Sequence, residues 1–159
     1  MRQSVLAPIL LALACQPVTA RPYFPPVTGA AQAEIRLEPK NATAALADVL
    51  QSDSLPVTKV VPRDGYLETD WFQVGSKKVA RGRRLGVDVV QIRAWVDPTR
   101  SGYSRLTVET VYRPLADASL SSRDLDRQVP PDHPVGKRVT EIVTELAKLY
   151  SPEPRTGEQ

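Results

Sequence analysis

The chain has 159 residues, with 21 lysines and arginines against 18 aspartates and glutamates, and a net charge of +3. This length fits one domain, and so small a basic excess does not by itself require a polyanionic partner. One cysteine and one histidine exclude an internal disulfide and the usual clustered metal sites. The chain also lacks the run of about 18 apolar residues that a membrane-spanning helix needs.

The beginning of the chain has the pattern of an export leader. Arg2 supplies a positive charge, and an apolar run of ten residues follows from Val5 to Ala14. Such a run is typical of a signal peptide and is too short to span a bilayer. We therefore predict a signal peptide over residues 1–14.

The segment Ala12-Leu13-Ala14-Cys15 resembles the bacterial lipobox, in which the leader is cut before a cysteine that becomes diacylated. The resemblance implies that Cys15 carries palmitate-type acyl chains and anchors the protein in the cell envelope. A lone cysteine in an exported chain has no disulfide partner, and two acyl chains are what stable anchoring requires. Gln16 follows the cysteine, and by resemblance to lipoprotein sorting this favours the outer membrane, with the protein facing the periplasm.

Two alternatives to lipidation stay open. Cleavage after Val18-Thr19-Ala20 would leave a soluble periplasmic protein. An uncleaved cytosolic helix is the other alternative, which Pro8 and Pro17 disfavour because proline interrupts a helix.

Prolines concentrate at the two ends of the mature chain. Four of them fall within residues 15–32, which we predict to be a Pro-rich tether. Two more occur within residues 151–159, predicted to be a disordered tail. The remaining segment, residues 33–150, is long enough for one hydrophobic core.

Alternating and β-branched patterns predict about five strands in this domain. The predicted strands cover residues 33–38, 56–61, 65–74, 86–96 and 103–115. In the strand 65–74, Leu67 and Trp71 are expected on one face and Phe72 on the other. A turn at residues 97–102 joins the last two strands as a hairpin, and residues 116–134 are predicted to be a polar loop.

Helical spacing of apolar residues predicts two helices. The first covers residues 41–51, with Asn41 as its expected N-cap. The second covers residues 135–150 and carries a continuous apolar stripe. The order is β-α-β-β-β-β-α, and each strand has one polar face. We therefore predict an α+β two-layer sandwich, a mainly antiparallel sheet covered on one face by two helices and open on the other.

The helix segment Ala45–Leu50, the strand segment Gly65–Phe72 and the closing helix, behind a lipobox-like leader and a Pro-rich tether, resemble the BamC-type lipoproteins of the outer-membrane barrel-assembly machinery. The resemblance covers residues 33–150. It implies a helix-grip-like module that serves as an accessory scaffold and binds an envelope protein, without catalysis. The lipopolysaccharide-assembly lipoprotein is a second, weaker likeness.

Catalytic and cofactor motifs are missing from the sequence. His133 beside Asp132 could form an acid–base pair, but a solvated residue at a helix start explains it as well. Glu68 and Asp70 lie two apart on one predicted strand face, where a solvated surface is the simpler interpretation. No phosphate loop or nucleophile elbow is present. We predict no catalytic, metal-binding or cofactor-binding residues, and no enzyme activity.

The most unusual local feature is the stretch GSKKVARGRR at residues 75–84. It carries five positive charges, which are Lys77, Lys78, Arg81, Arg83 and Arg84. Outside the cytoplasm its partner would be an anionic lipid, a lipopolysaccharide phosphate or an acidic protein surface, and nucleic acid is excluded. A solvated loop between strands is the competing interpretation. Trp95, expected on the open sheet face, is a further predicted contact residue.

The sequence is compatible with two functions. The first is an envelope scaffold or accessory module that binds a protein through the basic stretch and the open sheet face. The second is a periplasmic ligand-binding module that holds a lipid or glycan in the concave sheet face. A cavity between the sheet and the closing helix would favour the ligand-binding module, whereas a flat exposed face would favour the scaffold.

Overall fold

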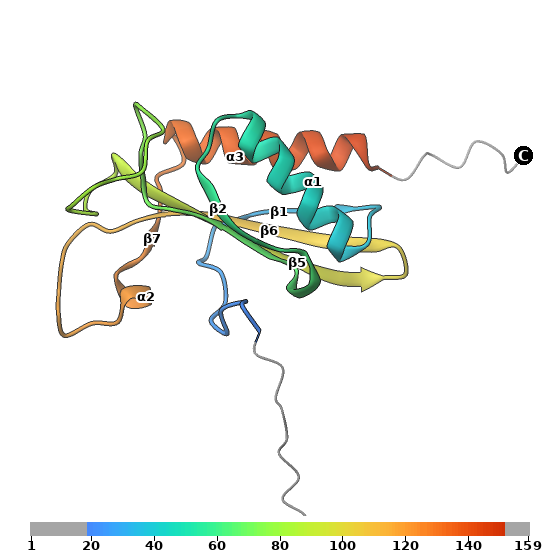
Figure 1. Ribbon diagram of the computed structural model, residues 1–159, viewed down its shortest axis with the longest axis horizontal. Helices are drawn as coiled ribbons and strands as arrows, with labels where there is room; N and C mark the ends of the chain where they lie inside the picture. The colour runs from blue at the N-terminus through green and yellow to red at the C-terminus, as the bar shows by residue number, and fades with distance from the viewer. Residues whose placement is uncertain (1–18, 152–159) are drawn as a thin grey trace, which may run out of the picture.

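The computed structural model describes residues 19–151. In this part of the chain a mainly antiparallel sheet carries two long helices on one face (Figure 1). The predicted α+β two-layer arrangement is thereby confirmed. The predicted signal peptide, Cys15 and the tail beyond Ser151 lie outside the described residues.

The sheet has seven strands within residues 19–151. They are β1 (Ala31–Ile35), β2 (Val57–Val61), β3 (Tyr66–Thr69), β4 (Phe72–Gln73), β5 (Val89–Arg100), β6 (Tyr103–Tyr112) and β7 (Arg127–Gln128). The order across the sheet is β1-β6-β5-β3-β2, with β4 beside β5 and β7 beside β6. The long β5–β6 hairpin is the centre of the sheet, and it turns at Gly102, whose φ of +75° suits glycine.

The predicted strand 65–74 is two strands separated by Asp70 and Trp71. At this break the Thr69 hydroxyl accepts the backbone N–H of Ile92 at 2.9 Å, in place of a ladder carbonyl. The break shifts the alternation of side chains, so Leu67 and Phe72 both pack in the core beneath the helices. Trp71 packs in a separate cluster with Val111 on the other face. The predicted assignment of Trp71 and Phe72 to faces was therefore wrong.

Two helices cover one face of the sheet. They are α1 (Pro39–Ser52) and α3 (Pro134–Leu149). Each buries one stripe of apolar residues, represented by Leu46 in α1 and Ile142 in α3, which are both 0% exposed. Asn41 is not the N-cap, because α1 begins earlier, at Pro39, after Glu38, and that residue makes no side-chain cap.

His133 caps α3 and is buried, contrary to the prediction of a solvated residue. Its Nδ1 accepts the backbone N–H of Gly136 at 3.4 Å, and its Nε2 lies 2.9 Å from the carbonyl oxygen of Val87. Since a carbonyl only accepts, we assign the proton to Nε2. This side chain ties the start of the closing helix to the loop before β5, and these two contacts engage both of its ring nitrogens.

The other face of the sheet is covered too, which corrects the prediction of an open face. Residues 19–30, here called the strap, cross this face from the β2 edge to β1 (Figure 1). The predicted loop 116–134 contains a short helix, α2 (Ser122–Leu125), and β7. Most of the predicted tether 15–32 is therefore packed on the domain, because the described part of it forms the strap and the start of β1.

Gly65, just before β3, provides a test of how tightly the chain packs against β5. Its φ is +61°, and an added Cβ would lie 2.2 Å from the carbonyl oxygen of Val96. We expect Gly65→Ala to lower the free energy of unfolding by about 2–4 kcal/mol, because left-handed backbone strain and overpacking add.

Gly75 is the matched control, since its φ is ordinary and nothing lies within 4 Å of an added Cβ. Gly75→Ala should change the free energy of unfolding by less than about 0.5 kcal/mol in urea denaturation. Equal stabilities for the two variants would contradict the close approach of Gly65 to Val96.

Candidate functional site

A buried cluster of charges lies between the sheet and its second cover. Arg93 on β5 and Glu109 on β6 are directly paired across the two strands. Their exposed fractions are 6% and 0%. The Nε atom of Arg93 lies 2.7 Å from Oε1 of Glu109, an ion pair whose geometry is not that of a directed hydrogen bond. Charged residues are almost never buried so deeply unless they are paired.

Both covering segments contribute to this cluster. The strap donates the backbone N–H of Val27 to Oε2 of Glu109 at 2.7 Å. Arg123 of α2 reaches Oε1 at 3.0 Å and also donates to the carbonyl oxygen of Pro25 in the strap. Glu109 thus joins the sheet, the strap and α2 at one point.

A second carboxylate completes the cluster. Asp126, which is 3% exposed, lies 2.5 Å from a terminal nitrogen of Arg93 and 2.8 Å from Nε of Arg113. Charge-assisted hydrogen bonds of this kind are stronger than neutral ones. All the carboxylate oxygens of Glu109 and Asp126 thus face arginines or the strap, and the cluster holds the layers together.

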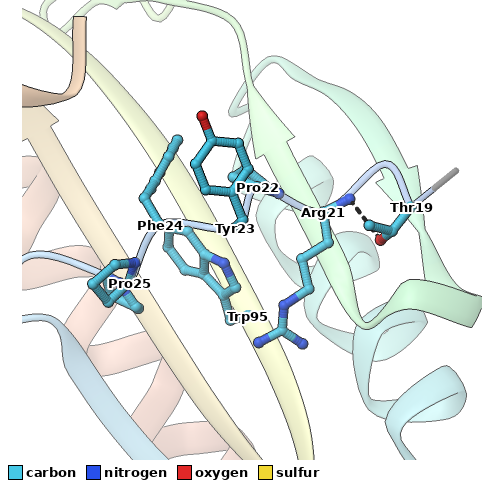
Figure 2. Close-up of a pocket in the computed structure, with 8 residues that line it drawn as sticks. Thr19, Arg21, Pro22, Tyr23, Phe24, Pro25 and Trp95 are labelled. Carbon is cyan, nitrogen blue, oxygen red and sulfur yellow. Dashed lines mark hydrogen bonds between the residues drawn. The ribbon is translucent and has the colours of Figure 1, made fainter. Parts of the chain in front are cut away.

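Aromatic side chains close the strap over the cluster. The Phe24 ring lies 5.4 Å from the guanidinium carbon of Arg93 and 4.7 Å from that of Arg123. It also meets Trp95 edge-on, with ring centroids 6.2 Å apart. Figure 2 shows Phe24 and its neighbours in the strap gathered around Trp95, where they line a shallow surface hollow. Cation–π contacts gain strength when the cation is desolvated, as Arg93 is.

Trp95 is therefore not an exposed contact residue. It lies on the predicted face of β5, but only 1% of its surface is exposed. Phe24 covers one side of its ring and Tyr66 meets it edge-on at 5.6 Å. Its Nε1–H has no acceptor within residues 19–151. The packing of two aromatic rings accounts for its burial.

The first residues of the strap are fixed at the β2 edge. The carboxylate of Asp64 accepts the backbone N–H of Ala20 at 2.8 Å and the hydroxyl of Thr19 at 3.2 Å. The hydrogen bond from Ala20 holds the pKa of Asp64 below its usual value. Lys59 donates to the carbonyl oxygen of Ala20, and Arg21 pairs with Asp97 at 2.7 Å. The strap is thus attached at both ends and at its middle.

The basic stretch 75–84 is divided by the structure. Lys77 points toward α1, where its Nζ lies 2.5 Å from the carbonyl oxygen of Asp53 and 3.5 Å from its carboxylate. Lys78, Arg81, Arg83 and Arg84 are exposed. Lys77 is therefore mainly a structural contact, whereas the other four form a surface.

This surface lies at one end of the sheet, beside the loop 113–121 (Figure 1). Arg83 and Arg84 share a shallow hollow with Arg113 and Leu115. The same two segments of the chain also carry exposed apolar side chains, namely Val79, Val87, Leu115 and Leu120. We call residues 75–88 and 113–121 together the basic end.

One other predicted feature is explained as a structural contact. Glu68 accepts the hydroxyl of Tyr66 at 2.6 Å and pairs with Lys59, so it does not form an acid–base pair with Asp70. Within residues 19–151, no group of three or more His, Cys, Asp or Glu is arranged to hold a metal ion. The same residues include no helix long and apolar enough to cross a membrane.

Comparison with known proteins adds no assignment. No protein-family model matches this chain, and no curated protein sequence matches it. The resemblance to BamC-type lipoproteins therefore stays a prediction.

The sequence did not predict the buried cluster, because alternation places its charged residues on the strand face that is expected to meet solvent. Arg93 and Glu109 alternate correctly for a polar face, yet their same-face neighbours include Trp95 and Val111. The sequence did contain one sign of burial: Trp95 and Val111 lie beside the opposite charges of Arg93 and Glu109 on two strands predicted to pair. The partners from the strap and from α2 are distant in sequence and gave none.

Substitution of Glu109 tests the cluster. Glu109→Gln removes one of the two buried carboxylates that compensate the guanidinium of Arg93 and leaves only Asp126 beside it. We expect a loss of about 3–5 kcal/mol in the free energy of unfolding, the usual result of breaking a buried ion pair.

Glu34→Gln is the control, because Glu34 pairs with Arg100 at the surface, with side-chain exposures of 42% and 62%. It should change stability by less than about 1 kcal/mol. If urea denaturation gave equal losses for the two variants, the cluster would not be the link between the layers.

Proposed function

We propose that this chain is a non-catalytic, lipid-anchored interaction module of the bacterial cell envelope, which acts as a scaffold or accessory factor. The resemblance noted above suggests outer-membrane assembly as its setting. The observation that carries the proposal is the basic end, a mixed cationic and apolar surface on a domain whose two sheet faces are both covered.

The chemistry of the basic end suits a protein partner with an acidic surface. Arginine and apolar side chains are the residue types that interface centres favour, and here Arg83 and Arg84 lie beside Leu115. Exposed positive charges speed encounter with an acidic surface and select against basic ones. Two glycines, Gly82 and Gly86, have positive φ in this stretch, so its backbone follows a path that other residues would strain.

The alternative, a lipid or glycan held in the concave face of the sheet, has less support. The strap and Phe24 occupy that face. On the helix side, the space between sheet and helices is filled by side chains such as Leu67, Ile92 and Ile142, each 0% exposed. A ligand would have to displace one of these covers, whereas the basic end is accessible without any rearrangement.

The lipid anchor is tested at Cys15, which lies outside the described residues. We expect radiolabelled palmitate to be incorporated into the intact chain in cells, and Cys15→Ser to abolish the label and release the protein from the membrane fraction. Cys15→Ser removes the only thiol that could be acylated. Unchanged labelling of this variant would contradict the anchor.

The basic end is tested by affinity purification from detergent-solubilised envelopes. A variant with four glutamines at Lys78, Arg81, Arg83 and Arg84 should recover at least tenfold less of the partner than the intact chain, and added salt should mimic the substitution, because such contacts are screened.

The control variant removes the same number of exposed charges from the helix side of the domain. Its glutamines replace Arg36, Lys40, Lys137 and Lys148. This variant should recover the partner normally. Recovery of no envelope protein by the intact chain, or equal loss in both variants, would count against the proposal.

A further inference from the structure

The face of the domain that carries the strap is the second surface of interest. Figure 1 shows the strap and α2 on the side of the sheet opposite α1 and α3. We call this side the strap face. We propose that the strap face lies against the bilayer, with α1 and α3 turned toward the periplasm; this inference rests on the lipid anchor at Cys15 proposed above.

The short distance from the anchor to the strap is the first argument. Thr19 and Ala20 are fixed to Asp64 on the domain, and only four residue steps separate Thr19 from Cys15. Four extended residues span at most about 14 Å. An acylated Cys15 would therefore hold the start of the strap within about 14 Å of the membrane surface, so the domain cannot stand off on a long tether.

The layering of the domain then selects the side. The strap lies beneath the sheet, and the helices lie above it (Figure 1). The helix layer is about 10 Å thick by itself, and the sheet lies between it and the strap. To bring the outer surface of α3 to the bilayer, the chain would have to run from Thr19 past the sheet and the helix layer, which is more than four residues can span.

The side chains of the strap face suit a membrane interface. Tyr23 is fully exposed, next to Phe24 and a row of prolines that line the hollow in Figure 2. Tyrosine favours the headgroup region because its ring is apolar and its hydroxyl is polar. A fully exposed tyrosine between prolines has no evident role in folding.

The charges of this face do not oppose the contact. Arg21 pairs with Asp97, Arg63 with Asp64 at 3.3 Å, and Arg123 with the buried Glu109. Paired charges leave little net field. Glu141 and Glu145 on the outer face of α3 are paired as well, both with Arg138, so the side is selected by the short link and the layering and not by charge.

Site-specific labelling of the full acylated chain tests the orientation. Cys15 is the only native cysteine, so once it is acylated an introduced cysteine is the only free thiol. Tyr23→Cys and Glu145→Cys are the matched pair, because both positions are exposed and lie on opposite sides of the domain. Each would carry a nitroxide on protein reconstituted into vesicles of phosphatidylethanolamine and phosphatidylglycerol.

The accessibility of each nitroxide to oxygen, which concentrates in lipid, is compared with its accessibility to a water-soluble nickel chelate. We expect the ratio at position 23 to exceed that at position 145 several-fold, and the difference to vanish in detergent-free Cys15→Ser protein. Equal ratios on vesicle-bound protein would overturn the orientation and leave the lipid anchor intact. Failure of the intact chain to bind vesicles would overturn both.

Discussion

The buried ion pair between Arg93 and Glu109 is the constraint on which the rest of the structure depends. Two charges side by side on the middle strands of a sheet cannot be left under an apolar cover, because an uncompensated buried charge costs several kcal/mol. Their cover therefore has to bring its own charges and donors, and it does so through Arg123, Asp126 and the backbone N–H of Val27. The positions of the strap and of α2 follow from this requirement.

Covering both faces changes where the protein can bind. A sheet with helices on one side and an open polar face on the other would bind through that open face. Here the strap occupies it, so what is accessible on that side is the outside of the strap and not the sheet itself. The same packing shortens the link to Cys15, because most of the predicted Pro-rich tether is part of the domain.

The elements with strong local patterns were predictable from sequence. The stripe of α3 follows from burial on one side, and the structure confirms it. It also confirms β5 and β6 as strands, although both of their faces are buried. The features that depend on distant contacts were not predictable. Thr69 breaks a strand by bonding Ile92, His133 is buried by reaching Val87, and the proline-rich strap is ordered by Glu109, 82 residues from Val27. Of the predicted contact residues, Lys78, Arg81, Arg83 and Arg84 are exposed, Lys77 is held by Asp53, and Trp95 is buried.

Hydrogen exchange of the Val27 amide tests most directly whether the strap is part of the folded domain. This N–H donates to a carboxylate that is 0% exposed, so it can exchange only when the strap opens. The structure predicts protection comparable to that of amides in β5 and β6, measured by NMR on the full chain. Exchange at the rate of an unstructured peptide would show that residues 19–30 are a free tether and that the second face of the sheet is open.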